Sequence, residues 1–202
     1  MRDNQPVTQN ELEVPPDQTL NTITDRKGRI TDANPSFIAM SGFLMDELIG
    51  QPHNLVRHPD MPAEAFRDMW QTIESGLPWT GLVKNRRKNG DFYWVRANAT
   101  PMRDGDKIVG YLSVRTSPSQ EEINAATSLY ASMREEAQNG RLRHILDRGV
   151  VLRTDPFSKV YRLLKPGMRG QLFWLAAWPA AIPLLIQALG LPFWIGLAGG
   201  LI

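Results

Sequence analysis

One short stretch of the chain concentrates side chains that could do chemistry. The run HNLVRHPDMP carries His53, Arg57, His58 and Asp60 and is bounded by prolines. Ring nitrogens and charged groups beside a sheet can line a polar ligand pocket. A plain Arg57–Asp60 salt bridge that fixes the loop is an equally good interpretation, and both can hold together. The run has no recognisable catalytic set, so we do not expect an enzyme.

Composition narrows the classes of function. The chain has 202 residues, a net charge of +2 and no cysteine. The lack of Cys excludes disulfides, thiolate nucleophiles, iron–sulfur clusters and cysteine-ligated zinc. The nearly balanced charge gives no reason to expect a nucleic-acid partner. The polar N-terminus is unlike a cleaved signal peptide.

Alternation and turn signals predict the elements that must position the polar run. Asn89-Gly90 separates two strand-like segments and is a strong hairpin signal. Asn34 followed by Pro35 predicts the start of a helix. The element order predicts an α+β fold, with a five-stranded antiparallel sheet and short helices on one face. The predicted strands are residues 20–25, 29–33, 79–87, 92–101 and 107–116, and the predicted helices are residues 35–41, 46–49 and 62–75.

The two faces of the predicted sheet differ in side-chain size. On one face the strands 79–87 and 92–101 are aromatic at an end and small beyond it, which leaves room for something flat. The other face carries Phe92 and Trp94, which suggests that a partner or an N-terminal cap packs there. Arg86, Arg87 and Lys88 are expected to form a solvated turn. The small-face residues are Gly81, Val83, Val95, Ala97 and Ala99.

The C-terminal part changes character twice. Ser119 and Glu122 form a capping-box pattern, which predicts a helix to about Ala137 that leads from the domain toward a membrane. Residues 141–170 are rich in Arg and Lys, as is typical of the cytoplasmic end of a span and of contact with anionic headgroups. Residues 171–202 contain no charge. We expect a transmembrane hairpin there, cut short at its end, with one broken helix or a buried core helix as alternatives.

The residues carry a resemblance to a known family. The strings HNLVRHPDMP and KNRRKNGD, with the strand FYWVRANATPM, resemble the PAS domains of bacterial aerotaxis receptors. The likeness is dense over residues 20–117 and looser beyond them. It implies a PAS sensor domain that binds FAD and reads cellular redox state, in a receptor of the bacterial inner membrane. It also implies further signalling domains of the same receptor, a homodimer, and signalling to the chemotaxis histidine kinase and its coupling protein.

The resemblance also implies an organisation of the chain. Residues 1–19 would be an N-terminal cap, residues 20–118 the PAS sensor domain, residues 119–170 a helical and basic linker, and residues 171–202 the transmembrane segment. Residues 1–170 would then lie in the cytoplasm.

The resemblance places the flavin site on named residues. It points to Arg57, His58, Asp60 and Trp79. By likeness to light-sensing LOV-type PAS domains, Asn85 would meet the flavin edge, His53 replaces their reactive cysteine and Arg115 replaces a glutamine. A cysteinyl–flavin adduct is therefore impossible. Four further residues complete the expected cofactor-binding set: Tyr93, Phe66, Trp70, which as a helix residue is more often core, and Asn34, which is first of all a helix cap.

Two other functions fit the same residues. A haem-binding PAS gas sensor would use His53 or His58 as the axial ligand. A cofactor-free docking module would need Trp79 and Tyr93 to fill the pocket themselves. FAD is preferred to FMN by the resemblance alone.

Overall fold

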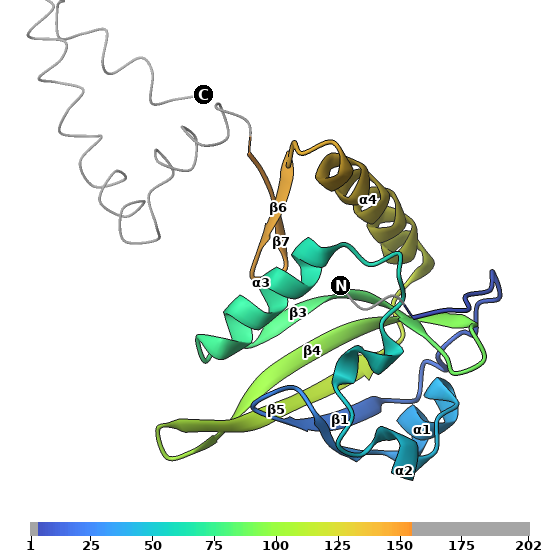
Figure 1. Ribbon diagram of the computed structural model, residues 1–202, viewed down its shortest axis with the longest axis vertical. Coiled ribbons are helices and arrows are strands. Elements are labelled where there is room, and N and C mark those ends of the chain that lie inside the picture. The colour runs from blue at the N-terminus through green and yellow to red at the C-terminus, as the bar shows by residue number, and fades with distance from the viewer. Residues whose placement is uncertain (1–3, 155–202) are drawn as a thin grey trace, which may run out of the picture. The chain divides into compact units, whose positions relative to one another are not determined.

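The computed structural model describes residues 4–154, which form one compact unit (Figure 1). Its centre is a five-stranded sheet in the order β2-β1-β5-β4-β3, and every pairing is antiparallel. The α+β prediction and the predicted strands are confirmed within a few residues at their ends. The strands are β1 (Leu20–Asp25), β2 (Ile30–Ala33), β3 (Trp79–Arg86), β4 (Phe92–Asp104) and β5 (Lys107–Thr116).

Between β2 and β3 the chain forms the short helices that cover the inner face of the sheet. Asn34 begins the first of them, because its Oδ1 accepts a hydrogen bond from Phe37 N at 3.0 Å. Gly42 ends the same helix in the left-handed region at φ 73°. These elements are α1 (Pro35–Ser41), α2 (Met45–Leu48), the 3-10 turn η1 (His53–Val56) and α3 (Ala63–Glu74).

The outer face of the sheet is covered by both ends of the described chain. Leu12 N donates to Phe92 O at 2.8 Å, and the nearby Val14 is buried. The helix α4 (Gln120–Gln138) begins at the predicted capping box. Its Tyr130 stacks on Trp94, with ring centroids 6.2 Å apart. α4 therefore packs back on the face that carries Trp94, and its expected course toward a membrane stays a prediction.

The expectation of a solvated turn holds for Lys88, which is exposed, and is wrong for Arg86, which is buried. Arg86 is only 7% exposed and donates to Pro6 O at 2.7 Å. Arg87 Nε donates to Met40 O at 2.7 Å, and Lys88 Nζ lies 2.6 Å from Glu47 Oε1. A row of charges predicts exposure, but backbone carbonyls of the N-terminal segment and of α1 give Arg86 and Arg87 hydrogen-bond partners.

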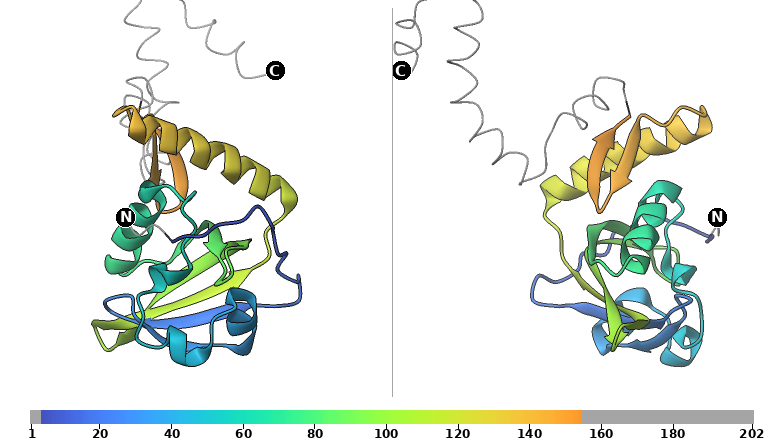
Figure 2. Two further views of the ribbon diagram at one scale, coloured as in Figure 1. Left: turned by 45° about the vertical axis from the view of Figure 1, so that its right-hand side comes forward. Right: turned by 90° about the vertical axis from the view of Figure 1, so that its left-hand side faces the viewer.

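After α4 the chain forms a two-stranded hairpin that the sequence did not predict. Its strands are β6 (His144–Asp147) and β7 (Val150–Arg153), and the hairpin lies between α3 and α4 (Figures 1 and 2). Four-residue strands give too little alternation for a strand prediction. Among residues 4–154, none of the helices combines the length and apolar character that crossing a bilayer requires. The expected membrane segment, residues 171–202, and the linker from residue 155 lie outside the described residues.

Candidate functional site

A cavity of about 160 Å³, open to solvent at one side, lies between the inner face of the sheet and the helices above it. Its floor includes Val83, Ala97 and Ala99, as the alternation in β3 and β4 predicted, whereas Gly81 and Val95 of the same predicted face do not line it. Ala97 pairs with Gly81 and Arg115, and Ala99 pairs with Ser113 across the sheet. This volume is smaller than the about 300–1,000 Å³ of typical small-molecule sites, so a larger ligand would extend through the open side.

The opposite wall is the apolar face of α3. Phe66, Met69, Trp70 and Ile73 line the cavity from this helix. Trp70 meets Tyr111 of β5 edge to face, with centroids 5.6 Å apart. The wall and floor therefore form a slot with aromatic and small apolar surfaces, which suits a flat ring system.

The closed end of the slot is polar. Arg115 Nη2 lies 2.7 Å from His53 Nε2, and Arg115 Nη1 donates to Thr22 Oγ1 at 3.0 Å. Because a guanidinium can only donate, His53 accepts at Nε2 and holds its proton on Nδ1. Burial, and then the charges of Arg115 and Arg57, hold the pKa of His53 well below its usual value. His53 is thus a neutral imidazole beside a buried cation.

Two buried hydrogen-bond donors in the cavity lining have no partner among residues 4–154. Asn85 is 2% exposed, and its Nδ2 has no hydrogen-bond partner among residues 4–154. Arg57 lies with its guanidinium carbon 3.4 Å from the centroid of Phe66, and its Nε is likewise unpartnered within that range. Burial lowers the pKa of Arg57 to about 10, so it remains a cation at neutral pH. Unpaired buried donors cost about 1–3 kcal/mol each, which a ligand with acceptor atoms would offset.

His58 and Asp60 lie outside the cavity lining. The chain crosses the edge of β3 here, because Arg57 forms a backbone bridge with Asn85 and His58 N donates to Lys84 O. Lys84 Nζ then meets Asp60 Oδ2 at 2.7 Å, and Asp60 N donates to His58 Nδ1 at 3.1 Å. Burial, and then Lys84, lower the pKa of His58 to about 4.

Three more of the expected site residues lie outside the cavity lining. Trp79 is buried and donates from Nε1 to Asp68 Oδ2 at 2.7 Å. Asn34 caps α1 and donates from Nδ2 to Thr19 O at 2.9 Å. Tyr93 is fully buried beside Asn85 across the strand pair, and burial raises its pKa. Of the expected set, the structure brings six residues to the cavity: His53, Arg57, Phe66, Trp70, Asn85 and Arg115.

Some lining residues were missed from the sequence. Thr22, Thr24 and Ser113 add hydroxyls to the floor, and Lys27 adds a cation at the mouth. The strand parity of β1 and β5 carried the signal for the hydroxyls, since these residues share the face of Ala97 and Ala99. Lys27 belongs to a turn, where parity gives no signal.

The geometry also bears on the other two functions. Of the two histidines considered for haem, only His53 reaches the cavity, and its Nε2 is engaged by Arg115. A filled pocket would require Trp79 and Tyr93 to occupy the cavity, and neither lies in its lining.

Comparisons with known proteins agree with this fold. Residues 30–114 match the family model described as the PAS fold. The chain is 49% identical over 154 residues to the aerotaxis receptor of Escherichia coli, covering 76% of this chain and 30% of that protein. It is 33% identical over 114 residues to the nitrogen fixation regulatory protein of Klebsiella pneumoniae, covering 56% of this chain and 22% of that protein.

Among solved structures, the dark structure of the blue-light photoreceptor Aureochrome1 LOV matches with a TM-score of 0.49 and 20% identity, over 58% of this chain and 86% of that one. The chain spans less than a third of the length of the two curated relatives named above. The chain therefore carries a PAS domain and is a homologue of the aerotaxis receptor of Escherichia coli.

Proposed function

We propose that the cavity binds FAD and that the PAS domain is a cytoplasmic redox sensor. The observation that carries this proposal is the pair of unpartnered donors, Asn85 Nδ2 and Arg57 Nε, at a slot with aromatic and small apolar walls. A flavin ring needs apolar contact on its faces and hydrogen-bonding groups at its edge. The 49% identity to an aerotaxis receptor supports the same ligand class.

Each part of the lining has a role in this proposal. Trp70 and Phe66 would contact the ring faces, and Asn85 would bind the amide-like edge. Arg57 and Lys27 would bind the diphosphate as cations. FAD, when bound, supplies reversible electron transfer. Arg115 and the neutral His53 keep one positive charge fixed at the closed end, so they would favour a more negative ligand state.

The five expected residues outside the lining would act on the site indirectly. They would fix the loop, the strand pair and the helix that carry the lining: His58, Asp60, Trp79, Tyr93 and Asn34. We propose that they support FAD binding in this way, without contacting the ring.

The wider role is that of a membrane-anchored aerotaxis receptor. We propose that residues 1–19 are a cap, 20–118 the sensor, 119–170 the linker and 171–202 an inner-membrane anchor, with residues 1–170 cytoplasmic. Signals would pass through further domains of a homodimeric receptor to the chemotaxis histidine kinase and coupling protein. The identity to the E. coli receptor and the basic run before an uncharged stretch support this arrangement. Neither an enzymatic nor a nucleic-acid function is proposed.

The absorption spectrum of the purified 202-residue chain tests the cofactor. A two-banded yellow spectrum that bleaches with anaerobic dithionite, with FAD released on denaturation, is the expected result. Release of FMN would correct the cofactor and leave the sensor class intact. An intense single Soret band would replace flavin with haem, and His53 would be the first ligand to test. A colourless chain that does not take up added FAD would support the docking module.

A further inference from the structure

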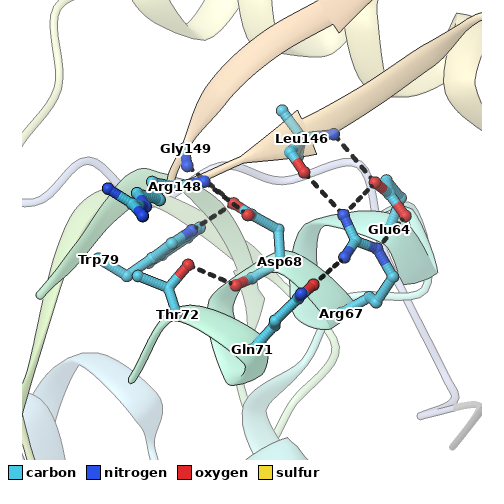
Figure 3. Close-up of polar contacts among 9 residues, drawn as sticks. All are labelled: Glu64, Arg67, Asp68, Gln71, Thr72, Trp79, Leu146, Arg148 and Gly149. Atoms are coloured by element: carbon cyan, nitrogen blue, oxygen red, sulfur yellow. Dashed lines mark hydrogen bonds and ion pairs between the residues drawn. The ribbon is translucent and has the colours of Figure 1, made fainter. Parts of the chain in front are cut away.

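The hairpin β6–β7 is attached to α3 through its own backbone (Figure 3). Asp68 Oδ1 accepts from Arg148 N and Asp68 Oδ2 accepts from Gly149 N, both at 2.7 Å. Glu64 Oε1 accepts from Leu146 N at 2.9 Å, and Arg67 Nη2 donates to Leu146 O at 2.7 Å. Because these bonds are made to backbone atoms of the hairpin, they hold its main chain in place against α3.

Asp68 joins three elements at one carboxylate. It is 2% exposed, and besides the two hairpin amides it accepts from Trp79 Nε1 at 2.7 Å. Hydrogen bonds to a carboxylate are about twice as strong as those between neutral groups. The start of β3, the middle of α3 and the turn of the hairpin are therefore held together by one buried side chain (Figure 3).

The hairpin turn includes a non-glycine residue in the left-handed region. Arg148 has φ 53°, and no other non-glycine residue in the range 4–154 has a positive φ. The left-handed region costs an ordinary residue about 1–2 kcal/mol. Such a conformation persists where its surroundings hold it. Asp147 pairs with Val150, so Arg148 and Gly149 form a two-residue loop, in which positive φ at both residues is usual. The two consecutive N–H groups of this loop donate to the Asp68 carboxylate.

The other side of α3 is the wall of the cavity. Met69 and Trp70 follow Asp68 directly in the chain, and both line the cavity, whereas Asp68 lies beneath the hairpin. A movement of the helix that changes the slot must therefore also change the geometry at Asp68. The far end of the hairpin is tied to α4, because Glu136 Oε2 accepts from Arg143 N at 2.8 Å and from His144 N at 2.9 Å.

We propose that Asp68 is a latch that docks residues 144–153 on α3 and thereby braces the helix that forms the cavity wall. Docking of the hairpin and occupancy of the cavity are then linked, and linkage between two sites is reciprocal. The hairpin lies within the proposed linker, residues 119–170, so we propose that the linker responds to the state of the cavity at this point. The bracing stands on the contacts alone, and only the identity of the ligand rests on the proposed function.

Amide hydrogen exchange of the full 202-residue chain in detergent tests the latch from both sides. Asp68→Asn keeps the side-chain shape but replaces one acceptor oxygen with a donor. Gly149→Ala acts from the hairpin, where φ is 79° and a Cβ would lie 2.1 Å from Thr80 O. Asp106→Asn, an exposed carboxylate in the β4–β5 turn, is the matched control.

Both test variants should exchange at least about threefold faster than the wild type in residues 144–153 and in α3, and the control should not. Gly149→Ala should also weaken FAD binding by about fivefold, although Gly149 is not in the cavity lining. Unchanged exchange in the hairpin overturns the latch. Faster exchange in the hairpin with unchanged α3 overturns the bracing. If the wild type binds no FAD, the proposed function fails, and the exchange of α3 still decides the bracing.

Discussion

Arg115 Nη2 and His53 Nε2 lie 2.7 Å apart at the closed end of the cavity. A guanidinium and an imidazole, each of which can carry a positive charge, are in direct contact here, and only the guanidinium is charged. The pKa of Arg115 is lowered by burial to about 10, and that of His53 is held well below its usual range. At neutral pH the pair therefore carries a single charge, on Arg115, and its imidazole is an obligatory acceptor.

Buried neutral histidines make the stability of the domain depend on pH. The pKa of His58 is about 4 in the folded chain, because of burial and then Lys84, against about 6.5 when unfolded. Below pH 6.5 the unfolded chain binds a proton that the folded chain does not, so this contribution is present above pH 6.5 and is lost as the pH falls toward 4. Between pH 7 and pH 5 His58 should cost about 2 kcal/mol of unfolding free energy.

Urea unfolding of the full chain in detergent at pH 7 and pH 5, followed by Trp fluorescence, measures this loss. The lowered pKa of His53 also makes the folded chain less stable as the pH falls. His58→Gln should remove the His58 share of the difference between the two pH values, whatever it does to stability at pH 7. An unchanged difference in the variant would show that His58 is not the buried neutral group inferred here.

The unpartnered amide of Asn85 predicts a large effect on binding and a small effect on stability. Asn85→Ala should weaken FAD binding by about tenfold or more, because a buried donor to the ligand is lost. The ligand-free chain should lose less than about 1 kcal/mol, since the amide makes no Nδ2 hydrogen bond within residues 4–154. Fluorescence titration with FAD and urea unfolding give the two values.

Asn98→Ala is the control for Asn85→Ala. Asn98 lies on the next strand and accepts from Thr80 Oγ1 at 2.9 Å, outside the cavity lining. Equal FAD affinity in the two variants would remove Asn85 from the site.

The sequence predicted the fold well because its signals are local. Asn89-Gly90 and the alternation on either side of it predicted β3, β4 and the small-residue floor. The same alternation could not show where the cavity ends. Trp79 belongs to the cavity-facing set by parity, yet its indole is bound by Asp68 under a hairpin that comes from residues 144–153. That contact is distant in sequence and has no local signal.

The polar run shows the same limit. His53 and His58 look equivalent in HNLVRHPDMP, and both were expected at the site. The η1 turn leaves His53 in the cavity, and the backbone bridge from Arg57 to Asn85 carries His58 past the edge of β3. Which of the two histidines meets a ligand is therefore decided by pairing with a strand, and not by the spacing of the residues in the loop.

The floor of the slot predicts that a larger side chain will exclude the ligand. Ala97 is 5% exposed and lies in the floor, and Ala97→Leu would place additional methyl groups in the space above it. FAD affinity should fall by more than about tenfold, while the ligand-free chain should be as stable as the wild type or up to about 1 kcal/mol more stable, because buried methylenes contribute about 0.8 kcal/mol each.

The same titration and unfolding measurements apply to Ala97→Leu. Thr100→Leu is the control, since Thr100 is exposed on the same strand. Normal FAD binding by Ala97→Leu would mean that the ligand does not lie on this floor.

Gly28 lies in the cavity lining and Gly105 lies outside it, so alanine substitutions at the two positions form a matched comparison. Both have positive φ, 73° and 57°, so alanine is strained at either position. At Gly28 a Cβ would also lie 2.8 Å from the Trp70 ring, whereas at Gly105 it would meet nothing within 4 Å. Gly28→Ala should therefore be more destabilising than Gly105→Ala by about 1 kcal/mol or more, through displacement of Trp70.

Because Trp70 lines the cavity, Gly28→Ala should also weaken FAD binding, by about fivefold, and Gly105→Ala should leave it unchanged. Urea unfolding and FAD titration of the two variants give the comparison. If both variants lost the same stability and the same affinity, the close approach of Gly28 to Trp70 would contribute neither to the free energy of unfolding nor to FAD binding.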